Sequence, residues 1–171
     1  MPDGITRERN RDLRGGFRSP WVRRALLGAI GVLPLLALLG FFGQKPSTSA
    51  ATGAAASMRV TAPTRLRGGL IFQVRVTVTA HREIKQPTVL FDRGWWDSMS
   101  INSIAPEPSS AAARDGGVAL SYEDLPAGRT LTFWIYFQAN PTNVGERSED
   151  VSLLDGGTEL LHVHRSLTIF P

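Results

Sequence analysis

The sequence contains no cysteine, which excludes disulfide bonds, thiolate metal sites and cysteine nucleophiles. Lysine is scarce as well, because Lys45 and Lys85 are the only two. No Gly-x-Ser-x-Gly nucleophile elbow is present, and no acidic spacing matches a calcium-binding loop. With no catalytic constellation to point to, we predict a protein that is not an enzyme and that carries no cofactor.

Positive charge is concentrated at the start of the chain. Seven arginines precede the first long apolar run against three acidic residues, which accounts for the whole net charge of +4. A basic block beside a hydrophobic span is typical of the cytoplasmic flank of a membrane segment, where arginine meets anionic lipid headgroups. We therefore predict a basic cytoplasmic tail at residues 1–24. The neutral remainder, from Lys45 onward, argues against nucleic acid as a partner.

Residues 25–43 contain no charged or polar side chain. At about 1.5 Å per residue such a helix covers roughly 28 Å, close to the hydrocarbon thickness of a bilayer. Pro34 lies inside the run, and membrane helices tolerate proline although it kinks them. The positive-inside bias places the N-terminus in the cytoplasm and the larger part of the chain outside. The sequence therefore predicts a single-pass protein of the cell membrane.

Two export signals compete with this interpretation. The basic start, the apolar stretch and the small residues ending at Ala56 fit a secretory signal cleaved before Ser57. Arg23 and Arg24, followed by Ala-Leu-Leu, resemble a twin-arginine signal. However, the apolar run exceeds the usual length of a signal core, and the nearest cleavage site lies well beyond its end. The uncleaved anchor is favoured, and cleavage stays open as the alternative.

Beyond the apolar run the composition changes twice. Residues 44–57 consist largely of serine, threonine, alanine and glycine, which bury little apolar surface, so we predict a flexible linker. Residues 58–171 alternate apolar and polar side chains with the period of two that marks half-buried strands. The clearest strands are residues 72–80 and 131–138; weaker candidates are residues 59–62, 88–92, 98–104, 118–122, 150–154 and 159–170.

Glycine-containing turns separate these strands, and Asp155-Gly156 between two apolar stretches is a good hairpin signal. Seven or eight short strands joined in this way are typical of an all-β, immunoglobulin-like antiparallel β-sandwich. A small β-barrel is the alternative, and the periodicity alone does not separate the two. The expected order is thus tail, transmembrane α-helix, linker and extracytoplasmic β-sandwich.

Several short motifs carry a family resemblance. They are residues 65–70 (Arg-Leu-Arg-Gly-Gly-Leu), 94–97 (Gly-Trp-Trp-Asp), 102–108, 138–145 and the ending Leu-Thr-Ile-Phe-Pro at 167–171. Together they resemble uncharacterised actinobacterial single-pass membrane proteins with an extracytoplasmic immunoglobulin-like β domain. The likeness covers most of the chain, including the apolar segment. It implies fold and topology and no particular activity.

His162 and His164 are two residues apart on a predicted strand and therefore face the same side. Two imidazoles can bind a metal when a third ligand joins them, and Glu159 or a neighbouring strand would have to supply it. The register places both histidines on the solvent side, with Leu161 and Val163 in the core. Two histidines without an evident third ligand are usually surface residues, so we predict no metal.

The candidate binding surface consists of aromatic and amide side chains. Trp95 and Trp96 are adjacent, so on a strand one enters the core and the other is exposed. Trp134 and Tyr136 lie on the outer side of their strand and would extend an aromatic platform. Asn140 and Asn143 lie in a polar loop of the kind with which sandwich domains bind partners. Cross-strand packing and simple turn formation are the structural explanations for the same residues.

These features predict a membrane-anchored extracytoplasmic module that binds or scaffolds another envelope protein without catalysis. Its partners would be the lipid bilayer and that second protein. A cell-wall glycan-binding module, using the tryptophans and Tyr136, is the first alternative. A β-sandwich secreted after signal cleavage is the second.

Overall fold

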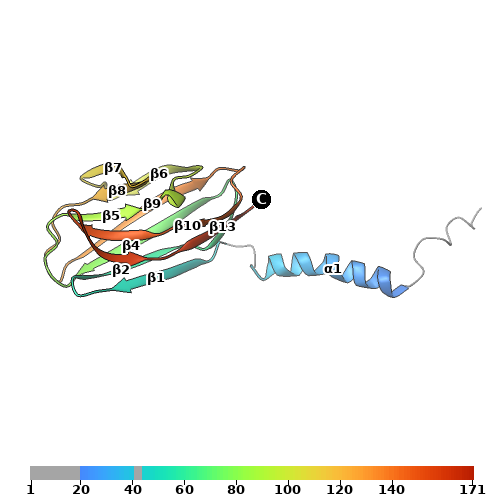
Figure 1. Cartoon of the computed structure of the whole chain (residues 1–171). Helices are drawn as coiled ribbons and strands as arrows, with labels where there is room; N and C mark the ends of the chain where they lie inside the picture. Colours follow the sequence, from blue (N-terminus) through green and yellow to red (C-terminus); the bar gives the residue numbers. More distant parts are fainter. Residues whose placement is uncertain (1–19, 41–43) are drawn as a thin grey trace, which may run out of the picture. The chain divides into compact units, whose positions relative to one another are not determined.

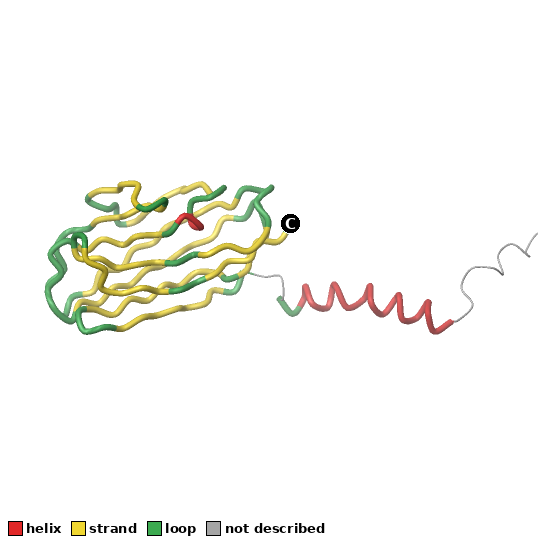
Figure 2. The backbone as a smooth tube through the Cα atoms, in the orientation of Figure 1, coloured by secondary structure: helices red, strands yellow, loops and turns green. Residues whose placement is uncertain are grey.

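The computed structural model describes residues 20–40 and 44–171. The chain divides into two units, residues 1–41 and 42–171, which are described separately. The first unit contains helix α1 (Pro20–Leu38) and the second contains the β domain. In Figure 2 the strands of the β domain, drawn in yellow, are joined by loops that gather mainly at its two ends.

Helix α1 contains no buried residue and is long and apolar enough to cross a membrane by length and composition. It begins at Pro20, earlier than predicted, and proline suits a first helical position because its missing N–H has no intrahelical partner there. Residues 20–24, assigned to the tail from the sequence, are therefore helical. The helix continues through Pro34. Residues 1–19 of the predicted tail and 41–43 of the predicted span lie outside the described residues.

The described part of the β domain forms two five-stranded sheets and one three-stranded sheet (Figure 1). The first, here called the aromatic sheet, has the order β1-β2-β4-β9-β6, and the second, the histidine sheet, has the order β12-β11-β5-β8-β7. The third sheet has the order β10-β13-β3. The bounds are β1 Pro46–Thr52, β2 Ala56–Pro63, β3 Arg65–Arg67, β4 Ile71–Ala80, β5 Pro87–Phe91, β6 Met99–Ala105, β7 Ser110–Arg114, β8 Gly117–Ser121, β9 Thr130–Ala139, β10 Gly145–Ser148, β11 Val151–Asp155, β12 Thr158–Val163 and β13 Ser166–Phe170.

The architecture confirms a mainly antiparallel β protein built as a sandwich, with one parallel pair, β13 with β3. Inward side chains of both five-stranded sheets form one hydrophobic core, in which Val74 and Ile135 of the aromatic sheet join Val89 and Leu153 of the histidine sheet. The predicted strands need revision in two respects. The stretch 159–170 is two strands, broken at residues 164–165, and strands β1, β3, β7 and β10 were not predicted.

The predicted flexible linker at residues 44–57 is wrong. Pro46–Thr52 forms strand β1, which pairs antiparallel with β2 along its whole length, from Pro46 opposite Pro63 to Thr52 opposite Ser57. Its serines, threonines and alanines bury little apolar surface, but backbone hydrogen bonds to an existing sheet edge hold it as a strand. The β domain therefore begins at β1 rather than at residue 58.

Hairpin turns form where the sequence indicates them. Asp155 pairs with Thr158 across the Gly156-Gly157 loop, which confirms the hairpin of β11 and β12. The β7–β8 hairpin turns at Asp115-Gly116, whose φ angles of 51° and 78° suit a two-residue loop with both residues left-handed.

Candidate functional site

A group of four polar side chains on the histidine sheet lies at the open end of the β11–β12 hairpin. Ser152 of β11 pairs directly with His162 of β12, next to the pair Val151 and Val163. Asp150 and His164 follow immediately outside that last pair. Because alternate residues share a face, these four side chains lie together on the outer side of the sheet.

A β-bulge decides this alignment. The register shifts between Leu153 and Leu154, so that Leu154 pairs with Glu159 whereas Leu153 pairs with Leu161. At this point β12 contains one residue more than β11. Without that extra residue, the two-residue turn would bring Leu161 opposite Ser152. A one-residue slip exchanges the two faces of a strand, so the bulge is what brings His162 to the same side as Asp150.

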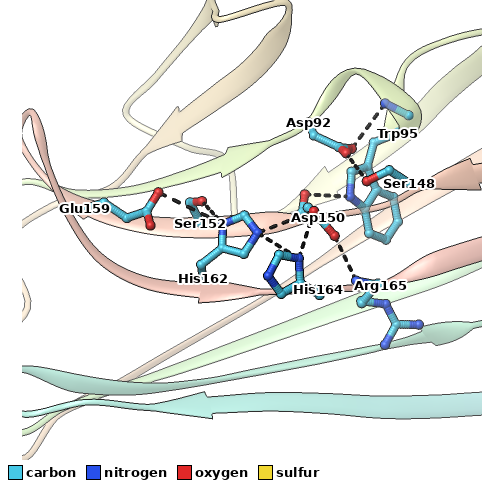
Figure 3. Close-up of polar contacts among 10 residues, drawn as sticks. Asp92, Trp95, Ser148, Asp150, Ser152, Glu159, His162, His164 and Arg165 are labelled. Carbon is cyan, nitrogen blue, oxygen red and sulfur yellow. Dashed lines mark hydrogen bonds and ion pairs between the residues drawn. The ribbon is translucent and has the colours of Figure 1, made fainter.

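Three potential ligand atoms converge in this cluster, shown in Figure 3. The Oδ2 atom of Asp150 lies 3.1 Å from Nδ1 of His164 and 3.4 Å from Nε2 of His162, and the two nitrogen atoms are 3.2 Å apart. The side chain of His164 is 84% exposed, whereas those of His162 and Asp150 are 32% and 25% exposed. The cluster is therefore anchored on the sheet and open to solvent on one side.

Hydrogen bonds to surrounding residues hold the two more buried members of the cluster, His162 and Asp150. Nδ1 of His162 lies 2.8 Å from Oγ of Ser152, a residue that is almost fully buried. The Oδ1 atom of Asp150 accepts a hydrogen bond of 2.9 Å from the backbone N–H of Arg165. Trp95 donates through Nε1 to the carbonyl oxygen of Asp150 at 3.2 Å. These contacts leave Oδ2 of Asp150 and Nε2 of His162 directed toward His164.

The electrostatics keep Asp150 ionised. Partial burial is the largest influence and by itself raises the pKa of this carboxyl group. Hydrogen bonds from the Arg165 backbone and from both imidazoles outweigh it and hold the pKa of Asp150 below its usual range. The cluster thus presents one carboxylate and two imidazole nitrogen atoms, a donor set that suits a divalent transition metal.

The neighbouring residues Glu149 and Arg165 point to the other side, into the sandwich. Arg165 donates through its guanidinium group to carbonyl oxygens of β2, at Val60 (3.1 Å) and Ala62 (2.9 Å), and so ties the β12–β13 connection to the aromatic sheet. Glu149 is fully buried, and neither of its carboxylate oxygens has a hydrogen-bond partner among the described residues. Burial raises the pKa of Glu149 to about 8, although the charges of Arg165 and Arg147 oppose the rise.

The structure separates the six residues of the predicted binding surface. Trp95 is completely buried and Trp96 is half-buried. Neither lies on a strand, because Trp95 ends a 3-10 turn (Arg93–Trp95) and Trp96 caps it. Both rings pack on Phe91 and Phe137, at centroid distances of 5.5 to 6.1 Å. One tryptophan, Trp95, therefore enters the core as predicted, whereas the prediction that the other is exposed is wrong because Trp96 is half-buried.

The loop between β9 and β10 is mainly a structural turn. The Oδ1 atom of exposed Asn140 accepts hydrogen bonds from the backbone N–H and the hydroxyl group of Thr142. Asn143 is buried and donates through Nδ2 to the carbonyl oxygen of Ser98 at 3.1 Å, and its side-chain oxygen accepts from Arg147. Asn143 is therefore not available at the surface.

Trp134 and Tyr136 do share the outer face of the aromatic sheet, as their spacing predicts. Tyr136 is 37% exposed and its hydroxyl group interacts with Gln73 on β4, while half-buried Trp134 pairs with Arg75 across the same two strands. The only charged residues in the five strands of this sheet, all of which are described, are Arg59 and Arg75, and both are exposed. The outer face of the aromatic sheet is therefore cationic and aromatic.

Comparison with known proteins does not identify a family: no family model matches, and no curated protein matches. Among solved structures, a non-cellulosomal cohesin from the hyperthermophilic archaeon Archaeoglobus fulgidus is 11% identical, with a TM-score of 0.41 over 61% of this chain and 84% of that one. AvmM, described as catalysing macrocyclization in alchivemycin A biosynthesis, is 8% identical, with a TM-score of 0.44 over 75% of this chain and 90% of that one. Both likenesses are too distant to carry an argument about activity.

Proposed function

We propose that this protein is a membrane-anchored extracytoplasmic binding module, in which an immunoglobulin-like β-sandwich contacts another envelope protein through the outer face of the aromatic sheet. The single observation that carries the proposal is the composition of that face. It exposes two arginines beside Trp134 and Tyr136, and its five strands contain no acidic side chain. Aromatic and arginine side chains are the residues that most often dominate the energy of protein interfaces.

The anchor part of the proposal rests on helix α1 and the charge that precedes it. The helix has no buried residue, and its length and composition suit a bilayer. The seven N-terminal arginines orient it with the N-terminus in the cytoplasm. On this proposal the chain is one of the actinobacterial single-pass membrane proteins that its motifs resemble.

The occupant of the face is a protein surface with acidic groups. Arg59 and Arg75 lie on neighbouring strands, since Arg59 pairs with Thr77 and Arg75 pairs with Thr61. Charge complementarity of this kind selects the partner and accelerates encounter. Tyr136 and Trp134 supply contact area at low entropic cost, because an aromatic ring has few rotatable bonds.

Site-directed photo-crosslinking on intact membranes tests the proposal. A photoreactive amino acid at Gln138, on the outer face of β9, is expected to crosslink one defined membrane or envelope protein. The same group at Ala112, on exposed strand β7 of the histidine sheet, is the matched control. Reversing both charges, with Arg59→Glu and Arg75→Glu, should abolish the Gln138 adduct, whereas Arg114→Glu on the other sheet should not. Equal adducts from both sheets would contradict the proposal.

A second candidate function is binding of a cell-wall glycan, which the side-by-side placement of Trp134 and Tyr136 favours because sugar rings stack on aromatic side chains. It predicts retention of the protein on isolated wall polysaccharide that Trp134→Ala removes. Retention that depends on the arginines but not on Trp134 would point to simple electrostatic adsorption instead.

Secretion after signal cleavage is the remaining alternative, because an apolar helix near the N-terminus also fits an export signal. N-terminal sequencing of the mature chain, with protease protection of membranes, separates the two. An intact N-terminus and a domain digested only from outside support the anchor. A chain that begins near Ser57 would have lost β1, which makes that cleavage site unfavourable on structural grounds.

A further inference from the structure

The three converging atoms of Asp150, His162 and His164 have the spacing of a metal coordination shell. Their separations are 3.1, 3.2 and 3.4 Å, close to an equilateral triangle. A zinc ion bound tetrahedrally at about 2.0–2.1 Å places neighbouring ligand atoms about 3.3 Å apart. We propose that this cluster on the histidine sheet is a zinc site with three protein ligands and one coordination position open to solvent.

The hydrogen bonds around the cluster prepare its donor atoms for a cation. If Nδ1 of His162 carries the proton, it donates to Oγ of buried Ser152, and the lone pair of Nε2 is directed at the cluster. The backbone of Arg165 occupies Oδ1 of Asp150 and leaves Oδ2 available. Such contacts, which fix the tautomer and orientation of a ligand, accompany most protein metal sites.

Hydrogen bonds among the three converging atoms do not satisfy all of them at once. Nε2 of His162 and Nδ1 of His164 both lie within reach of the same oxygen of Asp150 and within 3.2 Å of each other. If both nitrogens donate to the carboxylate, two N–H groups face each other; if one accepts from the other, it no longer donates to Asp150. A cation accepts all three lone pairs at once and removes this conflict.

The ligand types select the metal. Two imidazoles and one carboxylate are the ligands of zinc and of its first-row neighbours, whereas magnesium and calcium require oxygen donors in larger number. The chain contains no cysteine that would compete as a thiolate ligand. Copper is expected to bind more tightly than zinc in vitro, because the order of divalent affinities favours it at any nitrogen and oxygen site.

Two of the three ligands, Asp150 and His164, line a wide depression of about 700 Å³ together with Arg147, Ser148 and Arg165, among others. A smaller cavity of about 230 Å³, on the side of His162 and Ser152, adjoins the cluster. A water molecule, or a donor group brought by another molecule, therefore has access to the fourth position. Three protein ligands and one exchangeable position distinguish this site from a closed structural zinc site.

The test uses the full-length chain in detergent, prepared without a histidine tag, stripped with EDTA and titrated with Zn²⁺ by isothermal titration calorimetry. One Zn²⁺ per chain and a raised unfolding temperature are expected. His162→Ala and His164→Ala should each weaken binding about 100-fold or more, while Ser152→Ala should weaken it about 10-fold, with recovery in Ser152→Thr. His81→Ala is the matched control, because the third histidine of the chain contacts Gly53 instead.

Two further measurements keep the result interpretable. Circular dichroism and thermal unfolding in EDTA show whether each variant retains the native fold. Co²⁺ substituted for Zn²⁺ should give the intense visible absorption of tetrahedral cobalt, and Asp150→Asn should weaken or alter it. Zinc binding that survives the His162→Ala and His164→Ala double change in a folded chain, or a folded parent that takes up no zinc, would overturn the proposal.

Discussion

The two outer faces of the sandwich differ although they are built on one core. On the aromatic sheet, polar pairs run along the strands: Thr79 meets Thr130 at 3.0 Å and Thr48 meets Thr61 at 2.9 Å. The exposed charges there, Arg59 and Arg75, are both positive and lie on neighbouring strands. On the histidine sheet, by contrast, one carboxylate and two imidazoles crowd within hydrogen-bonding distance of each other. The two faces thus differ in chemistry: one spreads aromatic and positively charged groups over a sheet, and the other gathers three polar groups at one point.

Arg165 connects these two faces through the interior. It follows directly after His164, yet its guanidinium group reaches Val60 and Ala62 on β2 and the hydroxyl group of Ser49 on β1 at 3.1 Å. Hydrogen bonds of Arg165 therefore connect the edge of the aromatic sheet to the backbone that positions the histidine cluster. Changes to the shared parts should affect both faces, and changes to one outer face should leave the other intact.

The largest effect is expected from removing β1. A chain that begins at Met58 loses the strand paired with β2 and two of the acceptors of Arg165, on Ser47 and Ser49. We expect a loss of several kcal/mol in the free energy of unfolding and a tendency to aggregate through the exposed β2 edge. Urea denaturation of this chain, compared with one that begins at Gln44, measures the difference. Equal stability of the two would restore the view that this segment is a linker.

Phe137→Ala tests the common core. Phe137 stacks on Phe72 at 5.6 Å and contacts the rings of Trp95 and Trp96. Truncation of such a buried ring is expected to cost about 3–5 kcal/mol in the free energy of unfolding. Tyr136→Ala is the control on the next residue, which points outward, and should cost about 1 kcal/mol or less. Similar losses for both would contradict the assigned inward and outward alternation of β9.

Glu149→Gln addresses the buried carboxyl group beneath the histidine cluster. The pKa of Glu149 rises from 4.5 to about 8 on folding, so between these values the native state holds a proton that the unfolded chain has released. Its contribution to stability is therefore present below about pH 4.5, declines as the pH rises and is lost above about pH 8. At about 1.4 kcal/mol per pKa unit the decline amounts to a few kcal/mol.

The glutamine variant should consequently be more stable than the parent at pH 7 and similar to it at pH 4. Chemical denaturation across this range in the presence of EDTA measures both chains without interference from metal. Parallel pH profiles of the two chains would show that Glu149 is not the group responsible.

The smallest effect is expected on the aromatic face itself. Thr79→Ala removes the cross-strand hydrogen bond to Thr130 at the exposed end of β4 and β9. A loss of about 0.5–1 kcal/mol in the free energy of unfolding is expected. A double-mutant cycle with Thr130→Ala measures the coupling between the two hydroxyl groups, and the zinc affinity of these variants should equal that of the parent. A coupling energy of zero would mean that the pair stabilises nothing.

Several elements were predictable because the signal is local. The alternation at residues 72–80 and 131–138 corresponds to β4 and β9, and the Asp155-Gly156 turn corresponds to the β11–β12 hairpin. The outward direction of His162 and His164 also follows from the apolar residues between and around them. In each case the pattern predicts the backbone conformation of the residues that form it: a period of two indicates a strand, and a residue that accepts a left-handed conformation indicates a turn.

Other features depend on partners that are distant in sequence. The segment that forms β1 has the composition of a linker and becomes a strand because the edge of β2 is available to it. Trp95 and Trp96 look like strand residues, yet Gly94 lies so close to the carbonyl oxygen of Ser148 that a side chain there would collide with it. That close approach, with Asp92 capping the turn, directs both rings toward the core.

By itself, the sequence determined the apolar helix, the mainly β domain and the faces of its longest strands, because hydrophobic periodicity is a property of neighbouring residues. Only the tertiary structure decided the third member of the histidine cluster. Asp150 is distant in sequence from His162 and His164, and the bulge in β12 is what brings them to the same side. A shift of one residue in strand pairing reverses the face of every side chain, and no local pattern encodes where that shift occurs.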